Sequence, residues 1–125
     1  MRKQATVLGL TTAIAAIALV APATASAAAG FTGCIKHTNG TVCARVNATT
    51  VDVRYQKTGG STASTTFGYR YGSVYVTGPT ATVAVGQTVT KTMNLKKKSG
   101  TFLQGIVASA GTNIDHGLKT DHIRT

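Results

Sequence analysis

The chain contains no glutamate, and its only carboxylate side chains are Asp52, Asp115 and Asp121. Three histidines complete the small set of groups that could transfer a proton near neutral pH. A glycosidase needs two facing carboxylates, and nothing in the spacing of the aspartates supports such a pair. Neither a G-x-S-x-G motif nor a glycine-rich phosphate loop occurs. The sequence therefore argues against an enzyme and predicts no catalytic residues.

Residues that bind metals or cofactors are also scarce. Near the C-terminus, Asp115-His116 is echoed six residues later by Asp121-His122. Imidazole and carboxylate groups bind divalent transition metals, but this spacing matches no known metal site. We therefore interpret these pairs as parts of an exposed polar tail, and we predict neither a metal nor a cofactor.

Cysteine is limited to Cys34 and Cys43, so only one intramolecular disulfide is possible. In an antiparallel hairpin, the numbers of directly opposed residues have a constant sum. This sum is 77 if Cys34 and Cys43 lie opposite each other. This register predicts a four-residue loop over 37–40, in which Gly40 adopts positive φ. A bridge over so short a ring should stabilise the fold by about 2–3 kcal/mol. A redox or metal role is not expected, because the pair is not C-x-x-C and no second pair exists.

The first 27 residues resemble a bacterial secretory signal peptide in composition. Arg2 and Lys3 precede an uncharged apolar stretch over 5–20, and Ala-Ser-Ala at 25–27 forms the small-x-small site that a signal peptidase cleaves. We predict a cleaved signal peptide over 1–27 and a secreted, extracellular domain over 28–125.

This segment has two alternative interpretations besides cleavage. A retained transmembrane helix requires about 20 mostly apolar residues, and here Pro22 and the cleavage site argue against one. A lipoprotein would attach its lipid at Cys34, which lies too far from the apolar stretch, and lipidation would leave Cys43 unpaired in an oxidising compartment. We therefore expect no stable membrane insertion after cleavage.

The remaining 98 residues have the pattern of an all-β domain. Short segments rich in Thr, Val and Tyr alternate between apolar and polar residues, with glycine at the breaks. The strands are expected over 50–57, 64–71, 74–77, 80–85, 88–95 and 101–109. Their number and spacing predict a small single-domain antiparallel β-sandwich, Ig-like or Greek-key, with a small barrel as the alternative. The tail from Gly111 is expected to dock as a last short strand or to fray.

Tyrosine and arginine gather in the middle of the chain. Phe67, Tyr69 and Tyr71 alternate on one face and are interpreted as a core row. Tyr and Arg are enriched at interaction hot spots, and Lys96-Lys97-Lys98 is the densest charge in the chain. These lysines would also suit a loop that discourages edge pairing. The candidate interaction patch comprises Arg54, Arg70, Tyr75, Lys96, Lys97 and Lys98.

The charge of the predicted mature domain points to an anionic partner. Removal of the signal peptide takes Arg2 and Lys3 from the total of +10 and leaves +8. Such a domain is attracted to polyanions, although the charge could serve solubility alone. Export argues against nucleic acid, which leaves an anionic cell-wall polymer or an extracellular protein as the expected partner. A monomer is expected.

Two segments, Tyr69-Arg70-Tyr71 and residues 83–87 (VAVGQ), resemble parts of the small secreted bacterial α-amylase inhibitors. The resemblance implies a small β-sandwich with the aromatic-Arg-Tyr triplet on a turn. Those inhibitors have two disulfides, with the triplet between the first two cysteines, whereas Tyr69 follows both cysteines here. The family is not assigned on this basis. The leading hypothesis is a non-catalytic binding protein, followed by an inhibitor of a secreted protease or amylase and by a small antibacterial protein.

Overall fold

The computed structural model describes residues 30–95 and 100–125. The predicted signal peptide and Lys96, Lys97 and Lys98 lie outside the described residues. Residues 31–125 form one compact unit. Within the described residues, no helix is long and apolar enough to cross a membrane.

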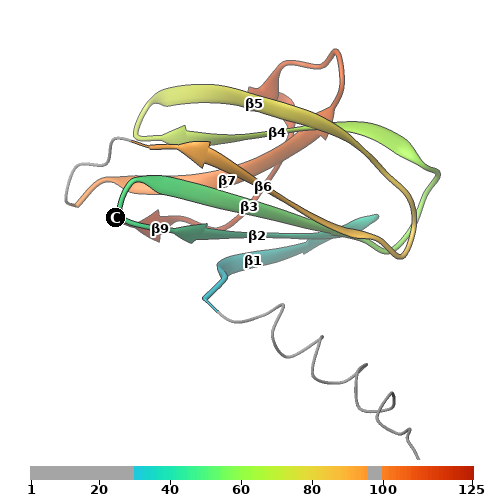
Figure 1. The fold of residues 1–125 in the computed structure, drawn as a ribbon, viewed down its shortest axis with the longest axis horizontal. Helices are drawn as coiled ribbons and strands as arrows, with labels where there is room; N and C mark the ends of the chain where they lie inside the picture. The colour runs from blue at the N-terminus through green and yellow to red at the C-terminus, as the bar shows by residue number, and fades with distance from the viewer. Residues whose placement is uncertain (1–29, 96–99) are drawn as a thin grey trace, which may run out of the picture. The chain divides into compact units, whose positions relative to one another are not determined.

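The unit is all-β and consists of two antiparallel sheets (Figure 1). One sheet has the order β1-β2-β3-β6, and the other has the order β5-β4-β7-β8, with β9 also paired to β7. The sheets do not close into a barrel, so the small-barrel alternative is wrong. The strands are β1 Thr32–His37, β2 Gly40–Val46, β3 Thr50–Lys57, β4 Ala63–Tyr71, β5 Val74–Val83, β6 Thr88–Asn94, β7 Phe102–Ser109, β8 Leu118–Lys119 and β9 Ile123–Arg124, with a 3-10 helix, η2, over Ile114–His116.

Alternation along the strands places the core between the sheets. Val51 and Val53 of β3 are completely buried, as the period-2 pattern predicts. From the opposite sheet, Phe67 and Leu103 are also completely buried and belong to the same cluster. Tyr71 packs against this cluster only partly buried. Packing of the two apolar faces is the main stabilising term for a domain of this size.

Next to its turn, the hairpin between β1 and β2 has the predicted register, but the turn differs, and the register shifts between Thr32 and Ile35, the segment that contains Cys34. Lys36 pairs with Thr41, and His37 pairs with Gly40, so the paired numbers sum to 77. The ladder therefore extends one pair further than expected and leaves a two-residue turn at 38–39. Gly40 does not adopt positive φ. A Cβ there would approach a ring carbon of Tyr55 to 2.5 Å, so close packing requires this glycine.

The predicted break at Gly78-Pro79 is wrong, because β5 runs through both residues. The register with β4 shifts by one residue between Thr66 and Gly68, which marks a bulge at this point. β5 lies at the edge of its sheet, where the missing N–H of Pro79 costs no ladder hydrogen bond. The C-terminal tail, in turn, docks on β7 as two short strands, β8 and β9.

Candidate binding surface

Two members of the predicted patch, Arg70 and Tyr75, lie side by side on the outer face of the five-stranded sheet. They are direct partners across β4 and β5, and the Arg70 guanidinium lies 5.6 Å from the centre of the Tyr75 ring. Arg70 Nε donates a hydrogen bond to the Gly72 carbonyl oxygen at 2.8 Å. This bond fixes the guanidinium while its terminal nitrogens stay available to a ligand.

The same face continues onto β7 and β9. Phe102 pairs with Arg124, whose guanidinium lies 4.6 Å from the centre of the Phe102 ring. The His122 ring meets Phe102 edge to face at 5.7 Å. Arg124 is held by a hydrogen bond from Nη1 to the Gly100 carbonyl oxygen. Phe102 nevertheless remains 45% exposed, which is unusual for a phenylalanine in a strand.

A shallow depression connects the two halves of this surface. Its volume is about 340 Å³, and Arg70, Phe102, Gln104 and His122 contribute to its lining. We call this surface the aromatic–arginine face and define it by Arg70, Tyr75, Phe102, His122 and Arg124. It combines π-faces, which attract cations and pack on apolar rings, with guanidinium groups, which bind carboxylate and phosphate in bidentate geometry.

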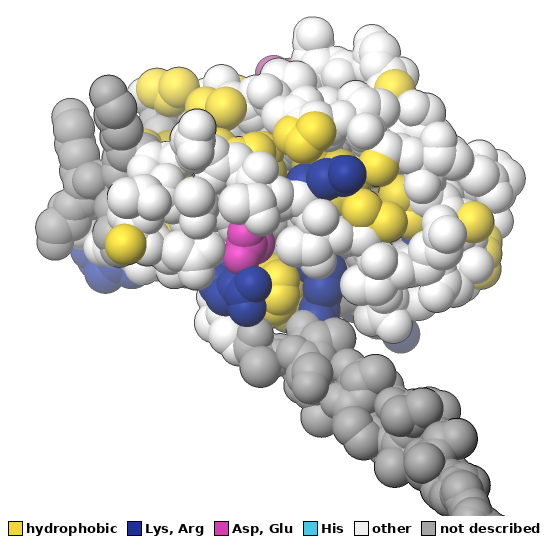
Figure 2. Space-filling model, in the orientation of Figure 1, with side chains coloured by type: hydrophobic (Ala, Val, Ile, Leu, Met, Phe, Trp, Pro, Cys, Tyr) yellow, Lys and Arg dark blue, Asp and Glu magenta, His cyan; other side chains and the backbone are white. Residues whose placement is uncertain are grey.

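The positive charges on this face are not neutralised by acidic neighbours. Within residues 30–95 and 100–125, Arg45 is the only Lys or Arg side chain in an ion pair, with Asp52 at 2.8 Å. Figure 2 shows the surface on the side of the four-stranded sheet, where an acidic side chain lies directly beside basic ones. Arg70 and Arg124 thus have no carboxylate partner among the described residues.

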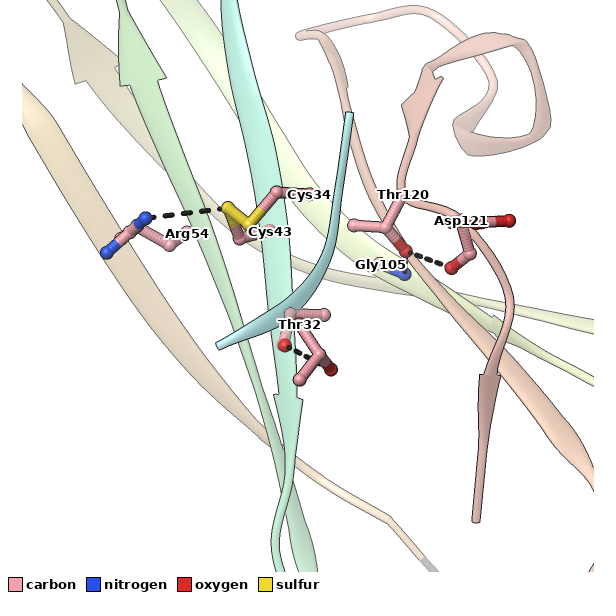
Figure 3. The surroundings of a disulfide bond; sticks show 8 residues. Thr32, Cys34, Cys43, Arg54, Gly105, Thr120 and Asp121 are labelled. Carbon is pink, nitrogen blue, oxygen red and sulfur yellow. Dashed lines mark hydrogen bonds between the residues drawn. A yellow bond between two sulfur atoms is a disulfide. The ribbon is translucent and has the colours of Figure 1, made fainter. Parts of the chain in front are cut away.

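Arg54, by contrast, is not part of an exposed patch. It belongs to β3 of the other sheet and is only 8% exposed, which corrects the expectation of a surface arginine. The Phe31 ring lies over it, with 4.7 Å between the guanidinium and the ring centre. Nη2 donates to the Cys43 sulfur at 3.4 Å (Figure 3). Burial lowers the pKa of Arg54 below its ordinary value, because desolvation disfavours the charged form.

The disulfide beside Arg54 forms as predicted between Cys34 and Cys43. The two Cα atoms are 4.2 Å apart, across neighbouring strands of the hairpin. Cys43 is buried, whereas Cys34 is exposed. The bridge therefore fastens the edge strand β1 to the interior of its sheet.

Asp52 forms the centre of a polar cluster on the same sheet. Its carboxylate accepts hydrogen bonds from Thr92 at 2.6 Å and from Arg45 at 2.9 Å, with Asn47 at 3.2 Å as a third donor. Burial by itself raises the pKa of this carboxyl group, but the three hydrogen bonds and the charge of Arg45 outweigh it and hold the pKa below its ordinary value. This carboxylate is fully occupied by structural contacts.

The sequence missed Phe102, His122 and Arg124. Phe102 lies in the strand predicted over 101–109, from which no residue was assigned to the patch, and only the pairing of β9 with β7 brings Arg124 beside it. The predicted lysines end two residues before Gly100, which lines the depression, but they lie outside the described residues. Within the described part of the chain, no group of three potential metal ligands occurs.

The triplet on which the resemblance to α-amylase inhibitors depends does not lie on a turn. Residues 69–71 belong to β4, and Tyr69 is a core residue whose hydroxyl donates to the Asn94 carbonyl oxygen at 2.7 Å. No protein-family model, no curated protein and no solved structure matches the chain.

Proposed function

We propose that this protein is a small, secreted, non-catalytic binding protein that recognises an anionic polymer of the cell envelope through the aromatic–arginine face. The observation that carries the proposal is the pairing of Arg70 and Arg124 with exposed aromatic rings, with no carboxylate partner for either arginine among the described residues. In this proposal the two sheets form a sandwich of the Ig-like or Greek-key type, which provides a rigid platform.

The chemistry of the face favours a polymer over a single ion. Its two guanidinium groups lie at opposite ends, beside Tyr75 and Phe102, and the depression lies between them. A chain with repeated negative charges and apolar or sugar-ring surfaces would contact both ends at once. Lys96, Lys97 and Lys98, which lie outside the described residues, add to the net positive charge that attracts a polyanion.

A direct binding assay tests the proposal. The protein should bind immobilised anionic wall polymer and heparin but not neutral dextran, and its affinity should fall steadily as salt is raised, because counterions screen exposed charges. Equal retention on dextran, or binding that is insensitive to salt, would show that charge does not drive recognition.

Export is tested separately by sequencing the N-terminus of the protein recovered from the culture medium. The proposal expects a chain that begins at Ala28. A protein found only in the cell, with Met1 retained, would contradict it.

A second candidate, the inhibition of a secreted hydrolase, is favoured by the tip of the β4–β5 hairpin. Val74 is 58% exposed and Tyr75 39% exposed, next to a turn in which Gly72 N donates to the Phe102 carbonyl oxygen. A rigid hairpin with exposed apolar side chains is the kind of element that can enter an active site. Assays against secreted proteases and amylases test this, with Val74→Ser expected to abolish any inhibition.

A further inference from the structure

A cavity of about 680 Å³ opens at the end of the two-sheet core where β3 ends and β4 begins. This volume lies within the usual range for small-molecule sites. Tyr55, Val107 and Leu118 provide apolar walls, and Thr65 contributes a hydroxyl. The cavity belongs to neither half of the aromatic–arginine face, with which it shares no lining residue.

Lys57 occupies a position in this cavity where the alternation of β3 requires an apolar side chain. It follows Val51, Val53 and Tyr55 in phase and is only 5% exposed, although its side chain ends in a charge. Opposite Lys57, β2 presents Gly40, against which the Tyr55 ring packs. Tyr55 and Lys57 line the cavity from successive inward positions of β3.

The Lys57 ammonium group has no partner among residues 30–95 and 100–125, where no acceptor lies within hydrogen-bond distance of Nζ. Lys119 shows the contrast, because its Nζ donates to the Asp115 and Gly117 carbonyl oxygens. The Nζ atom itself keeps some exposure, although the residue as a whole is buried. It can therefore pair with a carboxylate or phosphate group that enters the cavity, and the position of Lys57 favours an anionic ligand.

The other titratable groups around the cavity are also basic or neutral. Lys36, His37 and His116 line it, whereas all three aspartates of the chain lie outside the lining. His37 is oriented by a hydrogen bond from Nε2 to the Lys119 carbonyl oxygen at 3.0 Å. The cavity thus combines a positive field with apolar walls.

We infer that this cavity binds a small organic anion. One carboxylate or phosphate group pairs with Lys57 Nζ, and an apolar body of about the size of a benzene ring packs against Tyr55, Val107 and Leu118. This site goes beyond the proposed polymer binding and does not depend on it.

The test is a titration of the ¹⁵N-labelled protein with benzoate, phenyl phosphate and the neutral benzamide at constant ionic strength, followed by NMR. Benzoate or phenyl phosphate should shift the amide signals of Lys57, Thr65 and Leu118 with saturation in the millimolar range or below. Benzamide should shift them far less. Absence of saturable shifts at these amides with both anions, or equal shifts with benzamide, would overturn the inference.

Substitution of Lys57 tests whether this residue binds the anion or whether the net positive charge of the protein is enough. Lys57→Met keeps the length of the side chain and should weaken binding of the better anion about tenfold or more, because a charge-assisted hydrogen bond is lost. Lys91→Met is the matched control, since Lys91 also lies on the inner face, opposite Val53, but does not line the cavity. Equal affinities of the two variants would contradict the role of Lys57.

Two further measurements test the apolar part of the ligand and the independence of this site from the aromatic–arginine face. Inorganic phosphate should bind more weakly than phenyl phosphate, and equal binding would contradict the apolar part of the inference. The double substitution Arg70→Gln/Arg124→Gln should leave benzoate affinity unchanged, so failure of polymer binding and failure of this site give different results.

Discussion

The outer faces of the two sheets use arginine in opposite ways. On the four-stranded sheet, Arg45 pairs with a buried carboxylate, and Arg54 lies beneath Phe31 beside the disulfide. On the five-stranded sheet, Arg70 and Arg124 lie beside exposed aromatic rings, and no described carboxylate neutralises them. The first pair is part of the structure, and the second is available to a partner.

The difference teaches that strand alternation alone does not make a charged residue a surface residue. Arg54 and Arg70 occupy equivalent outward positions on β3 and β4. Arg54 is covered because Phe31 and the disulfide lie over its part of the sheet. Under this cover, Nε and Nη1 of Arg54 are buried without a hydrogen-bond partner among the described residues, whereas Arg70 has no such cover and is partly exposed.

Among changes to the four-stranded sheet, removal of the disulfide should have the largest effect on the free energy of unfolding. Replacing Cys34 and Cys43 by alanine should lower the free energy of unfolding by about 3 kcal/mol, because the unfolded chain regains the entropy of a short closed loop. Urea unfolding measures this change. Reduction of the unsubstituted protein should give a similar loss, and a loss under about 1 kcal/mol in both would contradict a stabilising role.

Asp52→Ala should have the next largest effect. Loss of the carboxylate leaves Thr92, Arg45 and Asn47 without their shared acceptor and should cost about 2 kcal/mol. Asp115→Ala is the matched control, since this exposed aspartate should contribute no more than about 0.5 kcal/mol. Equal effects of the two substitutions on urea unfolding would show that the cluster is not structural.

The same carboxylate should make the stability depend on pH. Its folded pKa lies below the ordinary value of 3.8, so its contribution is complete above that value and is lost as the pH falls through the folded pKa. The difference in unfolding free energy between the protein and Asp52→Asn should therefore be constant above about pH 5 and shrink below about pH 4. A difference in unfolding free energy that grows as the pH falls would contradict a lowered pKa of Asp52 in the folded state.

Substitutions on the aromatic–arginine face should have the smallest effect on stability. Arg70→Gln should change the free energy of unfolding by no more than about 0.5 kcal/mol, because its hydrogen bond is exposed. Arg54→Gln should cost more, since it disturbs packing beneath Phe31. Thermal unfolding of the two variants measures both changes. Equal losses of unfolding free energy would contradict the claim that Arg54 contributes more to stability than Arg70.

Local patterns predicted the inner faces, whereas contacts between distant segments decided the surface. Alternation at Val51 and Val53 and the spacing of the two cysteines depend on neighbours in sequence, and the structure bears both out. The run of β5 through Gly78-Pro79 depends on its place at a sheet edge, which the local sequence does not show. Phe102 meets Arg124 only through the docking of β9, from more than twenty positions away.

The most direct test of ligand binding by Arg70 and Arg124 compares two double variants that have the same net charge. Arg70→Gln/Arg124→Gln removes both guanidinium groups of the aromatic–arginine face, and Lys36→Gln/Lys91→Gln removes two cations elsewhere. Titration of anionic wall polymer at one low salt concentration should show about tenfold weaker binding for the first variant and a change of less than about threefold for the second. Equal weakening by the two variants would mean that net charge, and not this face, attracts the polymer.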